Sequence, residues 1–289
     1  MATELYLSDL DGTLLDSSGE VSERTRRGLR ALLEAGVPFS VASARSHFSI
    51  QKLFGADMPF PLPIIEFNGA FLTDYASGRH LEVYSLGKDF GEEVFDRVLA
   101  AGLRPFVCSY DGREDCLHYD ELINSGMQWY EERRRAAGDP RLRRTLDLRR
   151  TMGEQVVSLT VMAPDQARIF ALREELRETY GERLQLFCYE NEYSAGNWWL
   201  TIHHHSASKH IAMKRLQERY APGSKLTAFG DNVNDLSMLE NADVAVAVGN
   251  AVPAAKAVAH HVIGTNDENS VVRFLEERLG GAERAVGLE

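Results

Sequence analysis

The sequence predicts an α/β protein in which a parallel sheet forms the core and an α+β segment is inserted into it. Residues 5–13 support this first, because an apolar run leads into an acidic turn at Asp9 and Asp11, and a helix follows, as at the start of a βαβ unit. Residues 244–248 are apolar throughout, as expected for a strand covered on both faces. From about residue 86 the order of strands and helices becomes typical of an α+β domain.

The N-terminal part is expected to alternate strands and helices. Apolar residues recur at helical spacing after Ser22, which can cap a helix, and Gly36 can end it. Residues 76–79 have the composition of a hairpin turn. The expected elements are a strand at 5–9, a helix at 22–34, a strand at 37–42, a helix at 47–54, a strand at 64–65 and a hairpin over 71–84.

The same signals predict the elements of the rest of the chain. In the inserted segment we expect helices at 90–101 and 166–180 and strands at 105–109, 156–162 and 184–189. After it we expect strands at 198–203, 225–229, 244–248 and 262–263, and helices at 206–219, 236–239, 253–259 and 270–279. The arginine runs at 133–135 and 143–144 are interpreted as solvated helix faces, with contact to an anionic substrate as the alternative.

Composition excludes several classes of protein. The chain has 289 residues, of which 44% are hydrophobic and 26% charged, as is usual for a folded protein of one or two domains. A net charge of −11 argues against a nucleic-acid or membrane partner. We see no membrane-spanning run and no signal peptide. Three irregularly spaced cysteines fit reduced thiols, so we expect a cytoplasmic protein; they are Cys108, Cys116 and Cys188.

Asp9 and Asp11 are the first candidate functional residues. Side chains at i and i+2 of a strand share one side, so both carboxylates should project from the carboxyl end of the first strand. Close carboxylates repel each other unless a cation lies between them or one of them keeps its proton. The pair therefore predicts either a Mg²⁺ site or an acid beside a nucleophile. A hairpin turn and a calcium loop fit the flanking residues less well.

Polar residues also follow other predicted strands. Ser43 ends the second strand, Lys209 stands in the first turn of a helix, and a group of three follows the strand at 225–229, namely Asp231, Asn234 and Asp235. A serine cap for the helix at 47–54, a surface lysine and an acidic helix cap are the structural alternatives. The carboxyl ends of parallel strands meet at one edge, and this set of oxygens suits Mg²⁺ together with a phosphate.

The three consecutive histidines at 203–205 suggest a metal site only weakly. Adjacent side chains on a strand point in different directions and cannot all reach one ion. Exposed or packing roles are therefore favoured for them. We find no Walker loop, no dinucleotide-binding glycine pattern and no nucleophile elbow.

The chain resembles phosphatases of the haloacid dehalogenase (HAD) superfamily, in particular the Cof-like group with a large cap of the type IIB kind. The four motifs of that superfamily are matched by Asp9–Thr13, by Ala42–Arg45, by Lys209 and by Gly230–Asp235. Asn68–Ala70 and Gly249–Ala251 also fit the group. Two positions depart from the family pattern, which usually has glycine where Ala44 stands and often glycine where His210 stands.

The resemblance implies a Rossmann-like catalytic core, formed by residues 1–84 and 196–289, and an inserted cap over 85–195 that selects the substrate. It also implies that Asp9 attacks phosphorus to form an aspartyl phosphate. Asp11 would protonate the leaving alcohol and then take a proton from the attacking water.

The resemblance further implies how metal and phosphate are held. Mg²⁺ would bind the Asp9 side chain, the Asp11 backbone carbonyl and Asp231, with Asp235 in support. Lys209 would stabilise charge on the transferring group and pair with Asp9. The expected phosphate- and substrate-binding residues are Leu10, Ser43, Ala44, Arg45 and Asn234.

The sequence as a whole therefore predicts a Mg²⁺-dependent phosphomonoester hydrolase acting on a small phosphorylated metabolite, with a sugar phosphate as the first candidate. A phosphomutase is one alternative, but Asp9 and Ser43 lie too close in sequence for a cap between the first two motifs. A non-catalytic phosphosugar-binding regulator is another, although such a protein could dispense with Asp9 or Asp11, and both are present.

Overall fold

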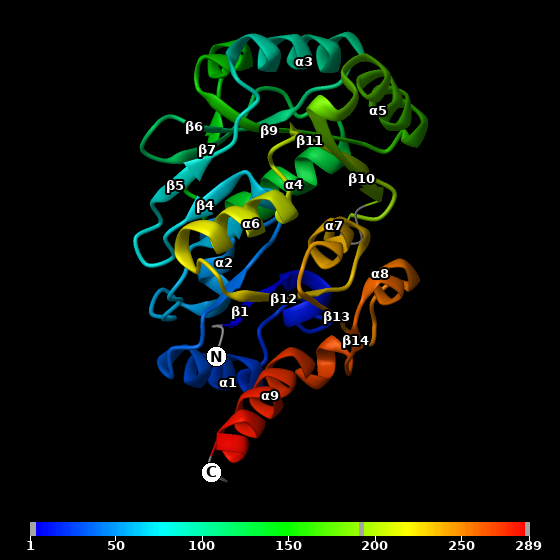
Figure 1. The fold of residues 1–289 in the computed structure, drawn as a ribbon. Helices are drawn as coiled ribbons and strands as arrows, with labels where there is room; N and C mark the ends of the chain where they lie inside the picture. The colour runs from blue at the N-terminus through cyan, green and yellow to red at the C-terminus, as the bar shows by residue number, and fades with distance from the viewer. Residues whose placement is uncertain (1–3, 191–193, 287–289) are drawn as a thin grey trace. The chain divides into compact units, whose positions relative to one another are not determined.

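A computed structural model describes residues 4–190 and 194–286 (Figure 1). The chain divides into two compact units. The first combines Met1–Glu82 with Ser208–Glu289, and the second is the segment Val83–Ala207 inserted between them. Over these described ranges, no helix has both the length and the apolar character needed to cross a bilayer.

The first unit is built on a parallel sheet with strand order β14-β13-β12-β1-β2. Side chains on both faces of the central strands are buried, which explains why the sequence shows apolar runs there and no alternation. The strands are β1 (Glu4–Ser8), β2 (Phe39–Val41), β12 (Lys225–Gly230), β13 (Val244–Ala247) and β14 (His261–Val262).

Helices cover both faces of this sheet. Figure 1 shows α1 and α9 together on one face, with α6 and α7 on the other. As predicted, Ser22 caps α1, since its hydroxyl accepts a hydrogen bond from the Thr25 amide at 3.0 Å. The helices are α1 (Glu23–Glu34), α2 (His47–Phe54), α6 (Lys209–Tyr220), α7 (Leu236–Glu240), α8 (Pro253–Val258) and α9 (Ser270–Val286).

A small sheet of order β3-β4-β5 continues the first unit after β2. Its strands are β3 (Ile64–Glu66), β4 (Phe71–Thr73) and β5 (His80–Val83), and a parallel bridge between Ala42 and Ile65 joins it to the segment after β2. The hairpin expected over 71–84 corresponds to β4 and β5.

The second unit is a six-stranded sheet with order β10-β11-β9-β6-β7-β8, antiparallel except between β7 and β8. Its strands are β6 (Phe106–Tyr110), β7 (Asp115–Tyr119), β8 (Leu142–Arg144), β9 (Gln155–Ala163), β10 (Leu184–Glu190) and β11 (Trp198–His204). Its helices are α3 (Lys88–Ala100), α4 (Ser125–Ala136) and α5 (Gln166–Tyr180).

Neighbouring residues of β6 show how the faces of this second sheet are used. Val107 packs into a hydrophobic cluster with residues of α3 and α5. The ring of Phe106 lies 4.9 Å, centroid to centroid, from the ring of Tyr130 in α4. Successive side chains of a strand point to opposite faces, so α3 and α5 cover one face and α4 contacts the other.

The predicted fold class, a parallel α/β core with an inserted mixed cap, is confirmed by this arrangement. The boundaries lie at 82/83 and 207/208, whereas the sequence placed them at 84/85 and 195/196. The second difference arises because β11, assigned to the core in advance, pairs antiparallel with β9 and β10 of the cap. The strands β7 and β8 were not expected at all.

Candidate active site

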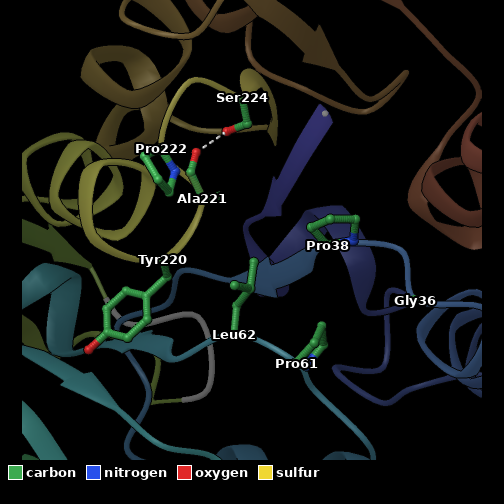
Figure 2. Close-up of a pocket in the computed structure, with 8 residues that line it drawn as sticks. All are labelled: Gly36, Pro38, Pro61, Leu62, Tyr220, Ala221, Pro222 and Ser224. Carbon is green, nitrogen blue, oxygen red and sulfur yellow. Dashed lines mark hydrogen bonds between the residues drawn. The ribbon is translucent and has the colours of Figure 1, made fainter. Parts of the chain in front are cut away.

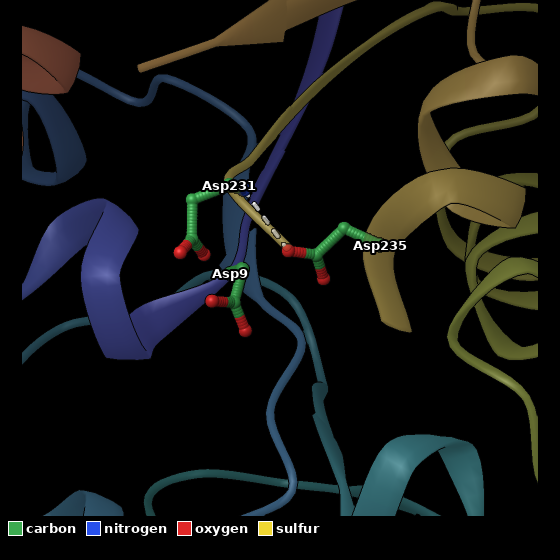
Figure 3. Close-up of side chains that lie close together, drawn as sticks. All are labelled: Asp9, Asp231 and Asp235. Carbon is green, nitrogen blue, oxygen red and sulfur yellow. Dashed lines mark hydrogen bonds between the residues drawn. The ribbon is translucent and has the colours of Figure 1, made fainter. Parts of the chain in front are cut away.

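Three carboxylates from separate positions in the chain meet at the carboxyl edge of the core sheet. Asp9 directly follows β1, Asp231 directly follows β12, and Asp235 lies in the turn before α7. One side-chain oxygen of each lies within 4.8 Å of those of the other two. Figure 3 shows the three side chains lying close together. The parallel topology explains this, because both strands end at the same edge.

Lys209 neutralises part of this cluster. From the first turn of α6, its Nζ donates to Asp9 Oδ1 at 2.5 Å and to Asp235 Oδ1 at 2.7 Å, and all three side chains are buried. Burial alone would lower the pKa of Lys209, but the charges of Asp235 and Asp9 outweigh it and raise that pKa. The lysine expected from the sequence to pair with Asp9 therefore does so.

Burial and mutual repulsion raise the pKa values of two of the carboxylates, because both effects disfavour the ionised form. Burial, followed by the charge of Asp235, raises the pKa of Asp9 well above its usual range. The same two causes raise the pKa of Asp231 to about 6, although a hydrogen bond from the Thr13 hydroxyl at 3.0 Å opposes the shift. The site thus concentrates negative charge that a cation would stabilise.

The residues present fit Mg²⁺. Carboxylate oxygens are hard ligands of the kind that Mg²⁺ prefers, and one or two carboxylates with several waters and a substrate phosphate usually complete its shell. In the part of the chain that the structure describes, this is the one group of three or more acidic, histidine or cysteine side chains close enough to share an ion. His203, weighed in advance as a ligand, is buried in β11 with its Nδ1 3.0 Å from the Val157 carbonyl oxygen.

Close packing at Gly12 shapes the catalytic turn, Leu10–Leu14. Gly12 has a φ of +78°, and a Cβ added there would lie 2.5 Å from Asp231 Oδ2. Only glycine can adopt this positive φ without strain and lie this close to Asp231 without displacing its carboxylate. The glycine of the Asp-Gly pair therefore allows the turn to approach the cluster.

Asp11 lies apart from the three clustered carboxylates. Its side chain is 47% exposed and accepts two hydrogen bonds from Arg45, from Nε at 2.9 Å and from Nη2 at 2.6 Å. The sequence identified both residues but not this contact, for which it carries no signal. A bidentate pair fixes the direction of the Asp11 carboxylate more firmly than a single bond.

The phosphate-binding candidates occupy the loops around the cluster. Ser43 is buried, and its hydroxyl accepts a hydrogen bond from the Arg45 amide at 3.1 Å. Leu10 is buried at the start of the catalytic turn, Ala44 is exposed and Asn234 is half-buried. The expected serine cap of α2 is confirmed: Ser46, directly before the helix, accepts a hydrogen bond from the Ser49 amide, and Ser43 takes no part in this cap.

The alternative that Asn234 or Asp235 caps the helix at 236–239 is wrong, because Asp235 stands at the N-cap of α7 but its side chain makes no capping hydrogen bond to that helix. Asp235 Oδ2 accepts hydrogen bonds from the amides of Asp231 and Asn232, at 3.1 and 3.2 Å. The same carboxylate binds Lys209 through Oδ1. Asp235 thus orders the backbone of this loop and belongs to the charged cluster as well.

A pocket of about 350 Å³ lies elsewhere in the first unit (Figure 2). Its lining residues precede β2, β3 and β12, at the amino ends of these strands, and include none of the candidates; they are Gly36, Pro38, Pro61, Leu62, Tyr220, Ala221, Pro222 and Ser224. Ligands of open α/β sheets bind outside the carboxyl ends of the strands, so we place the site at the carboxylate cluster.

Comparison with known proteins identifies the family. A family model described as haloacid dehalogenase-like hydrolase matches residues 6–275. The chain belongs to this family. The resemblance stated from the four motifs is thereby confirmed, and this member is a HAD-type phosphatase with an inserted cap.

Relatives of this HAD phosphatase match along almost its full length. The 5-amino-6-(5-phospho-D-ribitylamino)uracil phosphatase YitU of Bacillus subtilis is 29% identical over 96% of this chain and 98% of its own. The pyridoxal phosphate phosphatase YbhA of Escherichia coli is 28% identical over 96% of this chain and 100% of its own. A haloacid dehalogenase-like hydrolase of Bacteroides thetaiotaomicron shares the fold, with a TM-score of 0.76 and 24% identity over 95% and 98% of the two chains.

Proposed function

We propose that this phosphatase hydrolyses small phosphomonoesters with Mg²⁺ and through an aspartyl phosphate on Asp9. The supporting observation is the position of Asp9, whose buried carboxylate is held by Lys209 at 2.5 Å beside the carboxylates of Asp231 and Asp235. A carboxylate can attack an anionic phosphate only where positive charge offsets their repulsion. When bound, Mg²⁺ would supply that charge at Asp9, Asp231 and the Asp11 carbonyl, with Asp235 in support.

In the first step of this proposal, Asp9 forms a bond to phosphorus while the bond between phosphorus and the leaving oxygen breaks. Lys209 restrains the nucleophile by its contact with Oδ1 and contributes a fixed positive charge. Ser43, Asn234 and the amides of Leu10 and Ala44 bind the phosphoryl oxygens. The leaving oxygen takes the proton of the Asp11 carboxyl group and departs as the alcohol.

In the second step, water attacks the aspartyl phosphate. Asp11, now a carboxylate, removes a proton from this water as its oxygen bonds to phosphorus, and the bond between phosphorus and Asp9 breaks. Inorganic phosphate leaves, and Asp9 and Asp11 return to their starting states. Arg45, whose two hydrogen bonds stabilise the Asp11 carboxylate, is assigned to directing Asp11 as the base of this step. In the first step it releases the oxygen that carries the proton and binds the substrate instead.

For the substrate we propose a phosphate on a sugar or on a sugar-derived chain. Two relatives from Bacillus subtilis, YitU and YwtE, are named for 5-amino-6-(5-phospho-D-ribitylamino)uracil, whose phosphate stands on such a chain. Pyridoxal phosphate, for which the relative YbhA is named, carries its phosphate beside an aromatic ring and serves as the contrasting compound. We further propose that the cap, Val83–Ala207, selects among such substrates.

Phosphate release from a panel of phosphomonoesters tests this proposal. The panel contains hexose and pentose phosphates, the ribitylaminouracil phosphate, pyridoxal phosphate and an aryl phosphate. We expect turnover that requires Mg²⁺, stops on chelation and resumes when Mg²⁺ is restored, with the highest kcat/KM for a sugar-derived phosphate. Asp9→Asn should abolish turnover while circular dichroism shows that the variant stays folded. Full activity of purified Asp9→Asn protein, or indifference to chelation, would exclude the mechanism.

A further inference from the structure

The catalytic turn depends on groups outside itself for its shape. Leu15 N donates to Leu10 O at 2.9 Å and closes the turn, but Asp11 has a ψ of 118° and Gly12 a φ of +78°, neither of which is helical. The carbonyls of such a turn lack the regular partners of a helix. Their direction is therefore decided by donors from elsewhere in the chain.

Two asparagines from the C-terminal part of the chain supply these donors. Asn250 Nδ2 donates to Gly12 O at 2.8 Å, and Asn266 Nδ2 donates to Leu15 O at 2.9 Å. The two asparagines are linked, since the backbone N–H of Asn266 donates to Asn250 Oδ1 at 3.0 Å. Both ends of the Asn250 carboxamide are thus engaged, which fixes its orientation.

The loop that carries Asn250 also contacts the other side of the carboxylate cluster. It follows β13, and its Val252 amide donates to Asp231 O at 2.8 Å. Gly12 packs against the Asp231 carboxylate, and Thr13 donates to that carboxylate at 3.0 Å. One short loop therefore holds both Asp231 and the turn that lies against it.

We propose that Asn250 is a positioning residue for the metal site. By holding the Gly12 carbonyl it keeps the catalytic turn against Asp231, so that the Asp231 carboxylate and the Asp11 carbonyl stay at the spacing that Mg²⁺ requires. The proposal rests on the proposed function and adds a residue that acts on the metal ligands through the Gly12 carbonyl. It also gives a role to the Gly249–Ala251 motif, which the catalytic assignments leave unused.

The competing interpretation is that Asn250 is an ordinary structural link that contributes only to stability. Asn241 offers a matched control in the same unit. It is also exposed, and its Nδ2 donates to the Ser237 carbonyl at 2.8 Å, but its contact lies within α7 and its flank. Replacing either residue by alanine removes one exposed side-chain hydrogen bond to a carbonyl, and Asn250→Ala also removes the acceptor of the Asn266 backbone amide. Only Asn250→Ala releases the catalytic turn.

Calorimetric titration of the full chain with Mg²⁺ alone, without substrate, distinguishes these interpretations. Loss of groups that orient metal ligands typically weakens metal binding 10- to 100-fold. We expect the dissociation constant for Mg²⁺ to rise by about tenfold or more in Asn250→Ala and to stay within about twofold of wild type in Asn241→Ala. The KM for substrate at saturating Mg²⁺ should change little, whereas the Mg²⁺ concentration for half-activation should rise in parallel with the dissociation constant.

A second variant guards against a folding defect. Asn250→Asp keeps the acceptor for the Asn266 amide but cannot donate to Gly12 O. An added negative charge near the cluster would by itself strengthen cation binding, so weaker binding in Asn250→Asp must come from the lost donor. Equal Mg²⁺ affinity in wild type, Asn250→Ala and Asn250→Asp would overturn the proposal while leaving the proposed function intact. A wild-type protein that neither binds Mg²⁺ nor hydrolyses any ester would instead contradict the proposed function.

Discussion

Replacing Lys209 by methionine tests how strongly the buried cluster is coupled. The substitution keeps an unbranched chain of similar length and removes the charge that contacts Asp9 at 2.5 Å and Asp235 at 2.7 Å. At an effective dielectric constant of about 20, unit charges at such separations attract by about 6 kcal/mol for each pair. Desolvation offsets much of this, and removal of one partner of a buried ion pair is usually measured at about 3–5 kcal/mol.

We therefore expect Lys209→Met to lower the melting temperature by roughly 6 to 20 °C in the presence of a chelator, taking about 2–4 °C for each kcal/mol in a domain of this size. Added Mg²⁺ should restore stability more in the variant than in wild type, because three close carboxylates then lack their ammonium partner. Turnover should fall by about 100-fold or more at saturating Mg²⁺, as when one fixed positive or hydrogen-bonding group is removed from a transition state.

Lys214→Met, on the same helix α6, is the control for loss of a lysine that is not fully buried. Thermal unfolding followed by circular dichroism, with and without Mg²⁺, gives both shifts. The double variant Lys209→Met/Asp235→Asn should lose less free energy of unfolding than the two single variants lose together, because each single change already removes the contact between these two side chains. A Lys209→Met protein no less stable than Lys214→Met would refute the view that these buried contacts carry substantial energy.

Three further predictions follow from individual contacts. Gly12→Ala should abolish turnover and Mg²⁺ binding, because its Cβ would meet the neighbouring carboxylate at 2.5 Å; Gly36→Ala, at a φ of +82° with nothing within 4 Å, carries the backbone strain alone and should leave turnover unchanged. Arg45→Lys loses the bidentate contact with Asp11 and should lower kcat/KM by about 10-fold or more with little change in melting temperature; unchanged kcat/KM would contradict the role given to the pair. Burial would raise the pKa of Asp139, but hydrogen bonds from Arg141 lower it. The ionised Asp139 carboxylate therefore stabilises the cap fully when the pH is above the usual pKa of an aspartate, and this stabilisation is lost as the pH falls through the lowered pKa of Asp139. The melting temperature of Asp139→Asn should accordingly lie below wild type at pH 7, and the difference should begin to close below about pH 4.

Much of the core and of the charged cluster could be predicted because both follow from local pattern and sheet topology. A residue that follows a parallel strand must lie at the carboxyl edge, so Asp9 and Asp231 were bound to come close once both strands were identified. This reasoning does not apply to Lys209, because the strand before it, β11, belongs to the cap; Lys209 reaches the cluster from the first turn of α6, through its contacts with Asp9 and Asp235.

The remaining features depend on contacts for which sequence offers no local sign. The segment Trp198–His204 has the apolar pattern of many strands, and only its antiparallel pairing with β9 and β10 shows that it belongs to the cap. The strands β7 and β8 are short and rich in polar residues, so neither shows a clear period of two. The contacts of Arg45 with Asp11 and of Asn250 with Gly12 join residues distant in the chain through side-chain geometry alone.

The electrostatics of the cluster connects stability with function in this core. With all groups ionised, three carboxylates and one ammonium carry a net charge of −2 in a buried place, and the raised pKa values of Asp9 and Asp231 reflect that excess. A hydrophobic core of the same size would be more stable without these groups. Their excess charge equals in magnitude that of one divalent cation, and a dianionic phosphate can approach only after it is balanced. The arrangement that destabilises the core is therefore the one that makes cation binding favourable and, under the proposed function, allows a phosphate to bind at Asp9.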